Sequence, residues 1–110
     1  MGYNLEVKID NTNLYLARMG DAVEKALEEI GLTAESYAKM ACPVDTGRLR
    51  NSITHKVDMG DKAAIIGTNV EYAPYVEMGT SKAKAQPFLA PAAQNHTDTY
   101  RSILENNFKV

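Results

Sequence analysis

The sequence predicts an α+β fold in one domain, residues 1–110, in which a small antiparallel sheet packs against one long α-helix and a C-terminal α-helix. Three patterns indicate this fold. Apolar and polar residues alternate over residues 3–9 and again over 53–58, and apolar residues recur with helical spacing over 13–41. A chain of 110 residues with 45% apolar content is long enough for one such domain and its core.

The first element is a strand at about residues 3–9, with apolar side chains at every second position. A long helix at about 13–41 follows. Ten of its apolar residues, from Leu16 to Ala41, fall within an arc of roughly 120°, and charged residues occupy the opposite side. The stripe stays in phase across Gly31, which favours one continuous helix, about 43 Å long at 1.5 Å per residue.

Such a helix is longer than a compact domain of this size is wide, since the expected radius of gyration is only about 13 Å. We therefore expect one of its ends to project or to contact a partner. Leu14 and Leu32 lie off the apolar stripe and are candidates for that contact, although single exposed leucines are also common on protein surfaces.

The middle of the chain contains short elements separated by turn residues. Pro43 ends the long helix, and Asp45 or Thr46 can cap a turn and short helix at 45–51. An alternating strand at 53–58, turn residues at 59–62 and an apolar strand at 63–67 together predict a hairpin at about 53–67.

A short helix at about 74–78 and an exposed basic loop at 80–86 follow the hairpin. The C-terminal helix covers about 88–107, with regular helix beginning only near Pro91.

Charge is divided unevenly along the chain, whose net charge is −2. Residues 1–45 contain four Lys/Arg and eight Asp/Glu, a net −4, whereas residues 46–110 contain eight and six, a net +2. Opposite charge on two halves suits head-to-tail contact between copies, and the small total argues against a protein built mainly to bind nucleic acid. No apolar run approaches the roughly 20 residues that a membrane span needs.

The residues that usually carry catalysis do not form a recognisable motif. Cys42 is the single cysteine, and it follows a helix C-terminus, where the helix dipole disfavours a thiolate. His55 and His96 both lie on apolar faces of their elements and are interpreted as packing or interface residues. No zinc, phosphate-loop or nucleophile-elbow motif is present, so no enzyme and no cofactor are predicted.

Four cations form two pairs, Arg48 with Arg50 and Lys82 with Lys84. Phosphate contact is one interpretation, but ion pairing with an acidic neighbour such as the long helix fits the net charge better. Tyr72 and Tyr75 are interpreted as core or interface residues rather than as a stacking platform for single strands.

Two motifs resemble those of a known protein family. The first is CPVDTGRLRNSI at residues 42–53, and the second is VEYAPYVEMGTS at 70–81, which continues to QPFLAPA at 86–92. Their order and spacing after a long amphipathic helix resemble the small neck and tail-component proteins of long-tailed bacteriophages and prophages, also called head–tail joining or tail-completion proteins. The motif residues are Pro43, Asp45, Thr46, Gly47, Leu49, Tyr72, Ala73, Tyr75, Glu77, Gly79, Thr80, Pro87, Phe88, Leu89 and Pro91.

The resemblance implies a virion protein at the head–tail junction, made in the host cytoplasm, that forms a ring and has no catalytic activity. Its implied partners are a portal-side connector, the tail-tube or tail-terminator side, and further copies of itself. Sequence-specific DNA binding and membrane contact are not implied, although DNA in the channel can touch such a ring passively. The acidic face of the long helix either lines that channel or simply faces solvent.

We expect the motif residues to be chiefly structural. The candidate assembly contacts are Arg48, Arg50, Lys82, Lys84, Leu14 and Leu32, with the 80–86 loop preferred. A small nucleic-acid-binding or regulatory module is the first alternative function, and a hydrolase that uses Cys42 or a histidine is the second.

Overall fold

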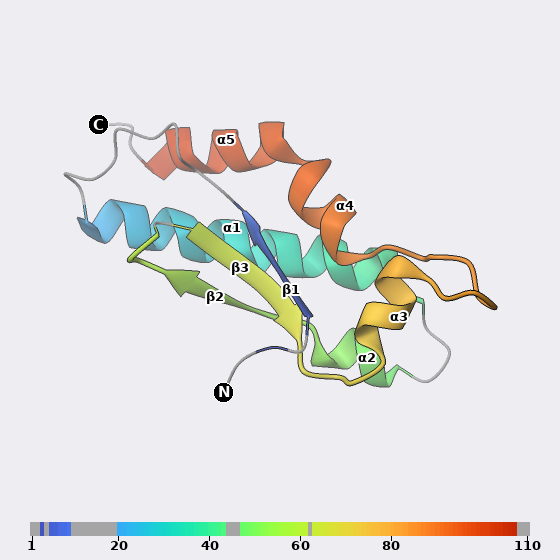
Figure 1. The fold of residues 1–110 in the computed structure, drawn as a ribbon. Helices are drawn as coiled ribbons and strands as arrows, with labels where there is room; N and C mark the ends of the chain where they lie inside the picture. Colours follow the sequence, from blue (N-terminus) through green and yellow to red (C-terminus); the bar gives the residue numbers. More distant parts are fainter. Residues whose placement is uncertain (1–2, 4, 10–19, 44–46, 62, 108–110) are drawn as a thin grey trace.

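The computed structural model describes residues 3, 5–9, 20–43, 47–61 and 63–107 (Figure 1). In chain order the elements are β1 (Leu5–Ile9), α1 (Gly20–Ala41), α2 (Arg48–Ser52), β2 (Thr54–Asp58), β3 (Ala63–Thr68), α3 (Ala73–Met78), α4 (Leu89–Gln94) and α5 (Thr97–Asn107). The strands form one antiparallel sheet against which helices pack, so the predicted α+β fold is confirmed.

The sheet has the order β1-β3-β2, with both neighbours antiparallel to the central strand. All six residues of β3 are buried; the strand has a partner on each side and packs against α1 and α4. At the edges, Val7 and His55 both lie opposite Ile66 and share its face. The hairpin expected over 53–67 corresponds to β2 and β3.

Helix α1 buries the apolar stripe that the sequence indicated, and it continues through Gly31 without a break. Its six most buried apolar residues are at most 2% exposed: Val23, Ala26, Leu27, Ile30, Ala34 and Ala38. The stripe ends earlier than expected, because Ala41 is exposed. The expected helical residues 13–19 lie outside the described part, and the 22 described residues span about 33 Å, within a molecule 51 Å long.

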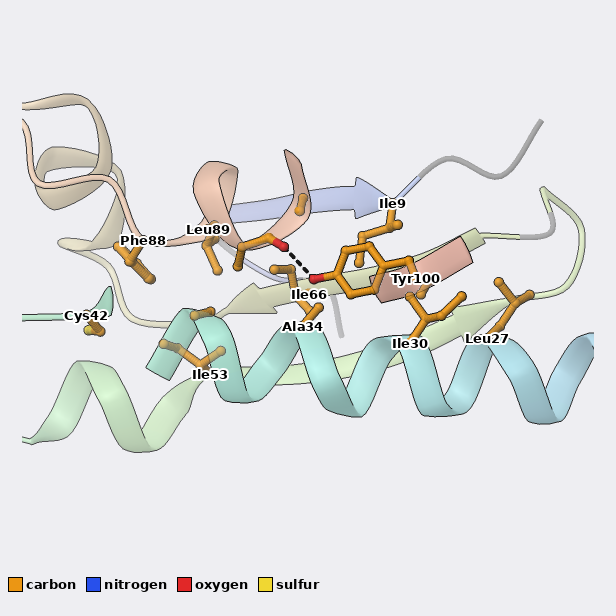
Figure 2. Packing of buried hydrophobic residues seen from close by; sticks show 14 of the residues in the cluster. Ile9, Leu27, Ile30, Ala34, Cys42, Ile53, Ile66, Phe88, Leu89 and Tyr100 are labelled. Carbon is orange, nitrogen blue, oxygen red and sulfur yellow. Dashed lines mark hydrogen bonds between the residues drawn. The ribbon is translucent and has the colours of Figure 1, made fainter. Parts of the chain in front are cut away.

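The core lies between the sheet, α1 and the two C-terminal helices (Figure 2). Ile30 and Leu27 of α1 face Ile66 of β3 and Tyr100 of α5 in this cluster. The Tyr100 hydroxyl donates a hydrogen bond to the carbonyl oxygen of Ala92 and so satisfies its polar group inside the core. Burial, with a smaller contribution from a neighbouring tyrosine, raises the pKa of Tyr100 to about 12.

The C-terminal helix expected at 88–107 is in fact two helices, α4 and α5, separated at Asn95 and His96. The bend lets α4 pack against β1 while α5 follows α1, which one straight helix could not do. Helix α4 begins at Leu89 rather than near Pro91. Pro91 is tolerated because it occupies the first turn, where its missing N–H would have no helical partner.

Helix α2 covers Arg48–Ser52, and its N-cap is Gly47 with no side-chain cap bond. Gly47 has φ 76°, a left-handed conformation that glycine adopts at little cost. The expected caps, Asp45 and Thr46, lie outside the described residues.

Candidate assembly surface

One end of the molecule gathers most of the residues that the two motifs contain. The last turn of α1, helices α2 and α3, and the segment 79–88 lie together there (Figure 1). We call this region the loop end. The opposite end is formed by the first half of α1 and the β2–β3 turn.

A buried carboxylate organises the loop end. Glu77, on α3, accepts hydrogen bonds from the backbone N–H groups of Phe88 (3.0 Å), Leu89 (2.9 Å) and Ala90 (3.0 Å). These N–H groups open helix α4 and have no partner within the helix. We call this arrangement the Glu77 clamp; it joins the second motif to the QPFLAPA segment.

The segment between α3 and α4 is closed on itself by backbone bonds. The Gln86 N–H donates to the Val76 carbonyl (2.8 Å), and the Thr80 N–H donates to the Ala83 carbonyl (2.8 Å). The Thr80 hydroxyl oxygen accepts from the N–H groups of Lys82 (3.2 Å) and Ala83 (3.0 Å). The expected basic loop is therefore a turn fixed by hydrogen bonds, not an extended segment.

Gly79 makes this closure possible. Its φ is 78°, and a Cβ at this position would lie 2.7 Å from the backbone nitrogen of Ala85. A larger residue would therefore strain the backbone and clash with the returning chain.

The two lysines of the loop project from this turn. Lys82 and Lys84 are both exposed, and no acidic side chain of the described residues forms an ion pair with either of them. Large apolar side chains are exposed at the same end: Met40 is 76% exposed, Tyr75 63% and Met78 69%.

The two arginines have partners within the chain. Arg48 forms a bidentate ion pair with Glu71, with nitrogen–oxygen distances of 3.1 and 2.9 Å, and lies 5.4 Å from the ring centre of Tyr72. Arg50 donates from Nε to the carbonyl oxygen of Lys39 (3.0 Å), near the C-terminal end of α1. The acidic partner of Arg48 is thus a turn residue and not the face of α1.

The remaining candidates divide between core and surface. Five motif residues are buried: Leu49, Ala73, Glu77, Phe88 and Leu89. Leu32 is 55% exposed on α1, and Leu14 lies outside the described residues. Tyr72 is half-buried beneath Arg48 and Tyr75 is exposed, so the two rings do not share one environment.

A second polar cluster was not anticipated from the sequence. His55, on β2, lies between two glutamates of α1: its Nδ1 is 2.7 Å from Glu35 Oε1, and its Nε2 is 2.6 Å from Glu28 Oε1. We call this arrangement the His55 clamp. Gly31 makes room for it, since a Cβ there would lie 2.7 Å from the imidazole Cδ2.

The charge state of the His55 clamp follows from its contacts. Burial opposes protonation, but the hydrogen bonds that Glu35 and Glu28 accept from the ring outweigh it and raise the pKa of His55 above its usual 6.5. Burial also disfavours the Glu35 carboxylate, but bonds from His55 and Lys39 lower its pKa below 4.5. The imidazolium therefore joins the sheet to the long helix.

The described residues show no arrangement typical of catalysis or metal binding. Cys42 is buried, and burial raises the pKa of its thiol despite the opposing charge of Arg50. His96 stacks on Tyr37 with ring centres 3.6 Å apart. Among the described residues, no group of three or more His, Cys, Asp or Glu could hold a metal ion, and no helix is both long and apolar enough to span a bilayer.

Comparison with known families identifies the family of this chain. A family model described as "Bacteriophage HK97-gp10, putative tail-component" matches residues 9–79, which is more than half of the chain. The chain belongs to this family. The match includes the long helix, the DTG motif, the hairpin and α3, and it ends at Gly79, where the loop begins. No curated protein and no solved structure matches the chain.

Membership in the HK97-gp10-like family confirms the resemblance to phage neck and tail components that the motifs indicated. The protein is thus a phage tail component, with other virion proteins as its partners. The Glu77 clamp joins the last matched helix, α3, to the unmatched helix α4.

Proposed function

We propose that this tail component is a non-enzymatic ring subunit at the head–tail junction, where it joins the head to the tail or completes the tail. Its partners are a portal-side connector and the tail-tube or tail-terminator side, and it needs no cofactor. It resides in the virion neck or tail and, before assembly, in the host cytoplasm. Family membership supports the setting, and the loop end supports the role.

The observation that carries this proposal is the basic loop at 80–86, whose shape is fixed by hydrogen bonds. The loop is closed at Thr80 and at Gln86, so its shape exists before any partner arrives. A preformed contact segment loses less conformational entropy on binding than a flexible one. Exposed Lys82 and Lys84, beside exposed Tyr75 and Met78, provide the charge and apolar surface that an assembly contact uses.

The other candidate contacts take secondary roles. Arg48 and Arg50 brace the loop end through Glu71 and the Lys39 carbonyl, so their partners within the chain favour the loop lysines as the contact. Leu32 offers a single exposed apolar side chain on α1, away from the loop end.

Complementation of a phage that lacks this protein tests the role. We expect the deletion to produce full heads and finished tails that remain separate under the electron microscope. The variant Lys82→Glu/Lys84→Glu should fold normally but fail to restore joined particles, because the loop charge is reversed.

A matched control reverses two exposed cations elsewhere, Lys56→Glu/Arg101→Glu, and should restore infectivity. Normal particles from the loop variant would contradict the loop as the contact. Intact virions from the deletion would refute the joining role, and missing tails would assign the protein to tail assembly itself.

A further inference from the structure

An open hollow lies beside α1 and the edge strand β2, at the end of the molecule opposite the loop. Its lining residues are Glu24, Lys25, Glu28, Glu29 and Val57. Three carboxylates and one ammonium group give this lining a net charge of −2, and because Glu28 already contacts His55, Glu24 and Glu29 are the carboxylates available to a second partner. No described element covers this face, and Glu24, Lys25 and Glu29 are exposed.

The loop carries the complementary charge. Residues 79–88 contain Lys82 and Lys84 and no acidic residue, a net charge of +2. Both lysines are exposed, and the turn that carries them is fixed by its bonds to Thr80.

The shape of a lysine side chain also fits the lining of the hollow. A lysine side chain has an apolar stem of four carbons and a charged tip, so it can lie along apolar surface while its ammonium group reaches a carboxylate. The hollow offers the half-buried apolar side chain of Val57 beside the carboxylates of Glu24 and Glu29.

The loop cannot occupy the hollow of its own molecule. The hollow lies on the first half of α1, and the loop lies beyond the last turn (Figure 1). From Glu29 to Ala41 alone, the helix advances about 18 Å, and the molecule measures 51 Å along its longest axis. The occupant with matching charge must therefore come from a second molecule.

We propose that the loop of one copy docks into the α1 hollow of a second copy, with Lys82 and Lys84 paired to Glu24 and Glu29. The contact joins different surfaces of the two copies, so its repetition generates a ring or an open filament. It also buries the acidic face of α1 between subunits rather than leaving it to line a DNA channel. This inference rests on the proposed function for its setting in the virion, but it predicts association of the chain by itself.

Charge reversal on each side separately gives a sharp test in solution. The loop-reversed variant is Lys82→Glu/Lys84→Glu, and the helix-reversed variant is Glu24→Lys/Glu29→Lys. Each variant alone places like charges at the contact, and we expect its self-association at low salt to weaken at least about tenfold, because facing like charges are repulsive. An equimolar mixture of the two variants restores opposite charges at every contact, so it should associate like the wild-type chain.

Analytical ultracentrifugation at low and high salt measures these equilibria. Circular dichroism shows that each variant folds, and Lys56→Glu/Arg101→Glu serves as the control that changes the net charge by the same amount as the loop-reversed variant. Three results would overturn the proposal: a wild-type chain that stays monomeric at low salt and high concentration, reversed variants that associate normally, or a mixture that fails to recover.

The outcomes separate this inference from the joining role. If the phage experiment supports joining but the chain does not associate through these residues, the loop contacts a different virion protein and only the copy-to-copy contact is wrong. If the mixture recovers but deletion leaves intact virions, the contact stands and the joining role is wrong.

Discussion

Two parts of the molecule are fastened by different chemistry. At the loop end, one buried carboxylate, Glu77, accepts three backbone N–H groups at the start of α4. Along the middle of α1, the imidazole of His55 joins β2 to the helix through two glutamate side chains. The first fastening positions a loop, and the second attaches a strand to a helix.

The difference lies in the partners and in their exposure. The N–H groups that Glu77 binds belong to the backbone, so they are present whatever the pH. The His55 clamp depends on side chains that gain or lose protons, and the side chain of Glu28 is 60% exposed to solvent. We therefore expect the Glu77 clamp to contribute more to stability, and the His55 clamp to respond more to conditions.

The largest expected effect is the loss of the Glu77 clamp. Glu77→Ala leaves three N–H groups without an acceptor, and we expect the free energy of unfolding to fall by about 3 kcal/mol. Urea denaturation followed by circular dichroism measures the loss. The free energy of unfolding of Glu77→Gln should lie between those of the wild-type chain and Glu77→Ala, because the amide keeps one acceptor oxygen.

The exposed Glu71 provides the matched control for this prediction. It binds a side chain, Arg48, rather than the backbone. Glu71→Ala should therefore cost far less than Glu77→Ala, and equal losses would contradict the special role of the buried carboxylate.

A smaller effect is expected where α1 approaches His55. Alanine favours a helix over glycine by about 1 kcal/mol, yet the Cβ of Gly31→Ala would lie 2.7 Å from the imidazole. The imidazole is held on both sides and cannot move freely, so we expect a net destabilisation of about 1–2 kcal/mol.

A double-mutant cycle isolates the cause. In the background of His55→Ala the clash is gone, and Gly31→Ala should then stabilise the protein by about 1 kcal/mol. Thermal or urea unfolding of the wild-type chain, the two single variants and the double variant shows whether Gly31→Ala destabilises the protein with the imidazole present and stabilises it without. Destabilisation that persists without the imidazole would show that something other than His55 requires the glycine.

The smallest effect is the pH response of the His55 clamp. The folded pKa of His55 is raised, so its contribution is complete below 6.5 and is lost as the pH rises through the folded value. The folded pKa of Glu35 is lowered, so its contribution is present above 4.5 and is lost as the pH falls through the folded value.

The clamp should therefore stabilise the protein most between about pH 4.5 and 6.5. The difference in unfolding free energy between the wild-type chain and His55→Phe, measured by urea titration from pH 5 to 9, should shrink as the pH rises. A difference that stays constant over this range would contradict a protonated imidazole in the fold.

The sequence predicted the elements whose signal is periodic. The alternation in β1 and the apolar stripe of α1 both follow from the need to bury one face, and the structure buries that face. The division of the C-terminal helix was missed, because its apolar face continues in phase from Leu89 to Leu104 across the bend. Periodicity reports which side is buried and says nothing of a change in direction.

The candidate site was predictable only in part. The loop, its lysines and the motif residues stand out by composition and spacing. The roles of Glu77 and His55 do not, because their partners lie 11 to 13 residues away for the first and 20 and 27 residues away for the second. No local pattern relates residues at such separations.

The sequence by itself determined the α+β class, the family and the opposite charge of the two halves, because these depend on residue types and their order. Only the tertiary structure decided that Glu77 binds the N–H groups at the start of α4, that Gly31 leaves room for His55, and that the basic loop and the acidic hollow lie at opposite ends. Each of these depends on how close residues that are far apart in the sequence come in space, and that closeness is set only when the chain packs its core.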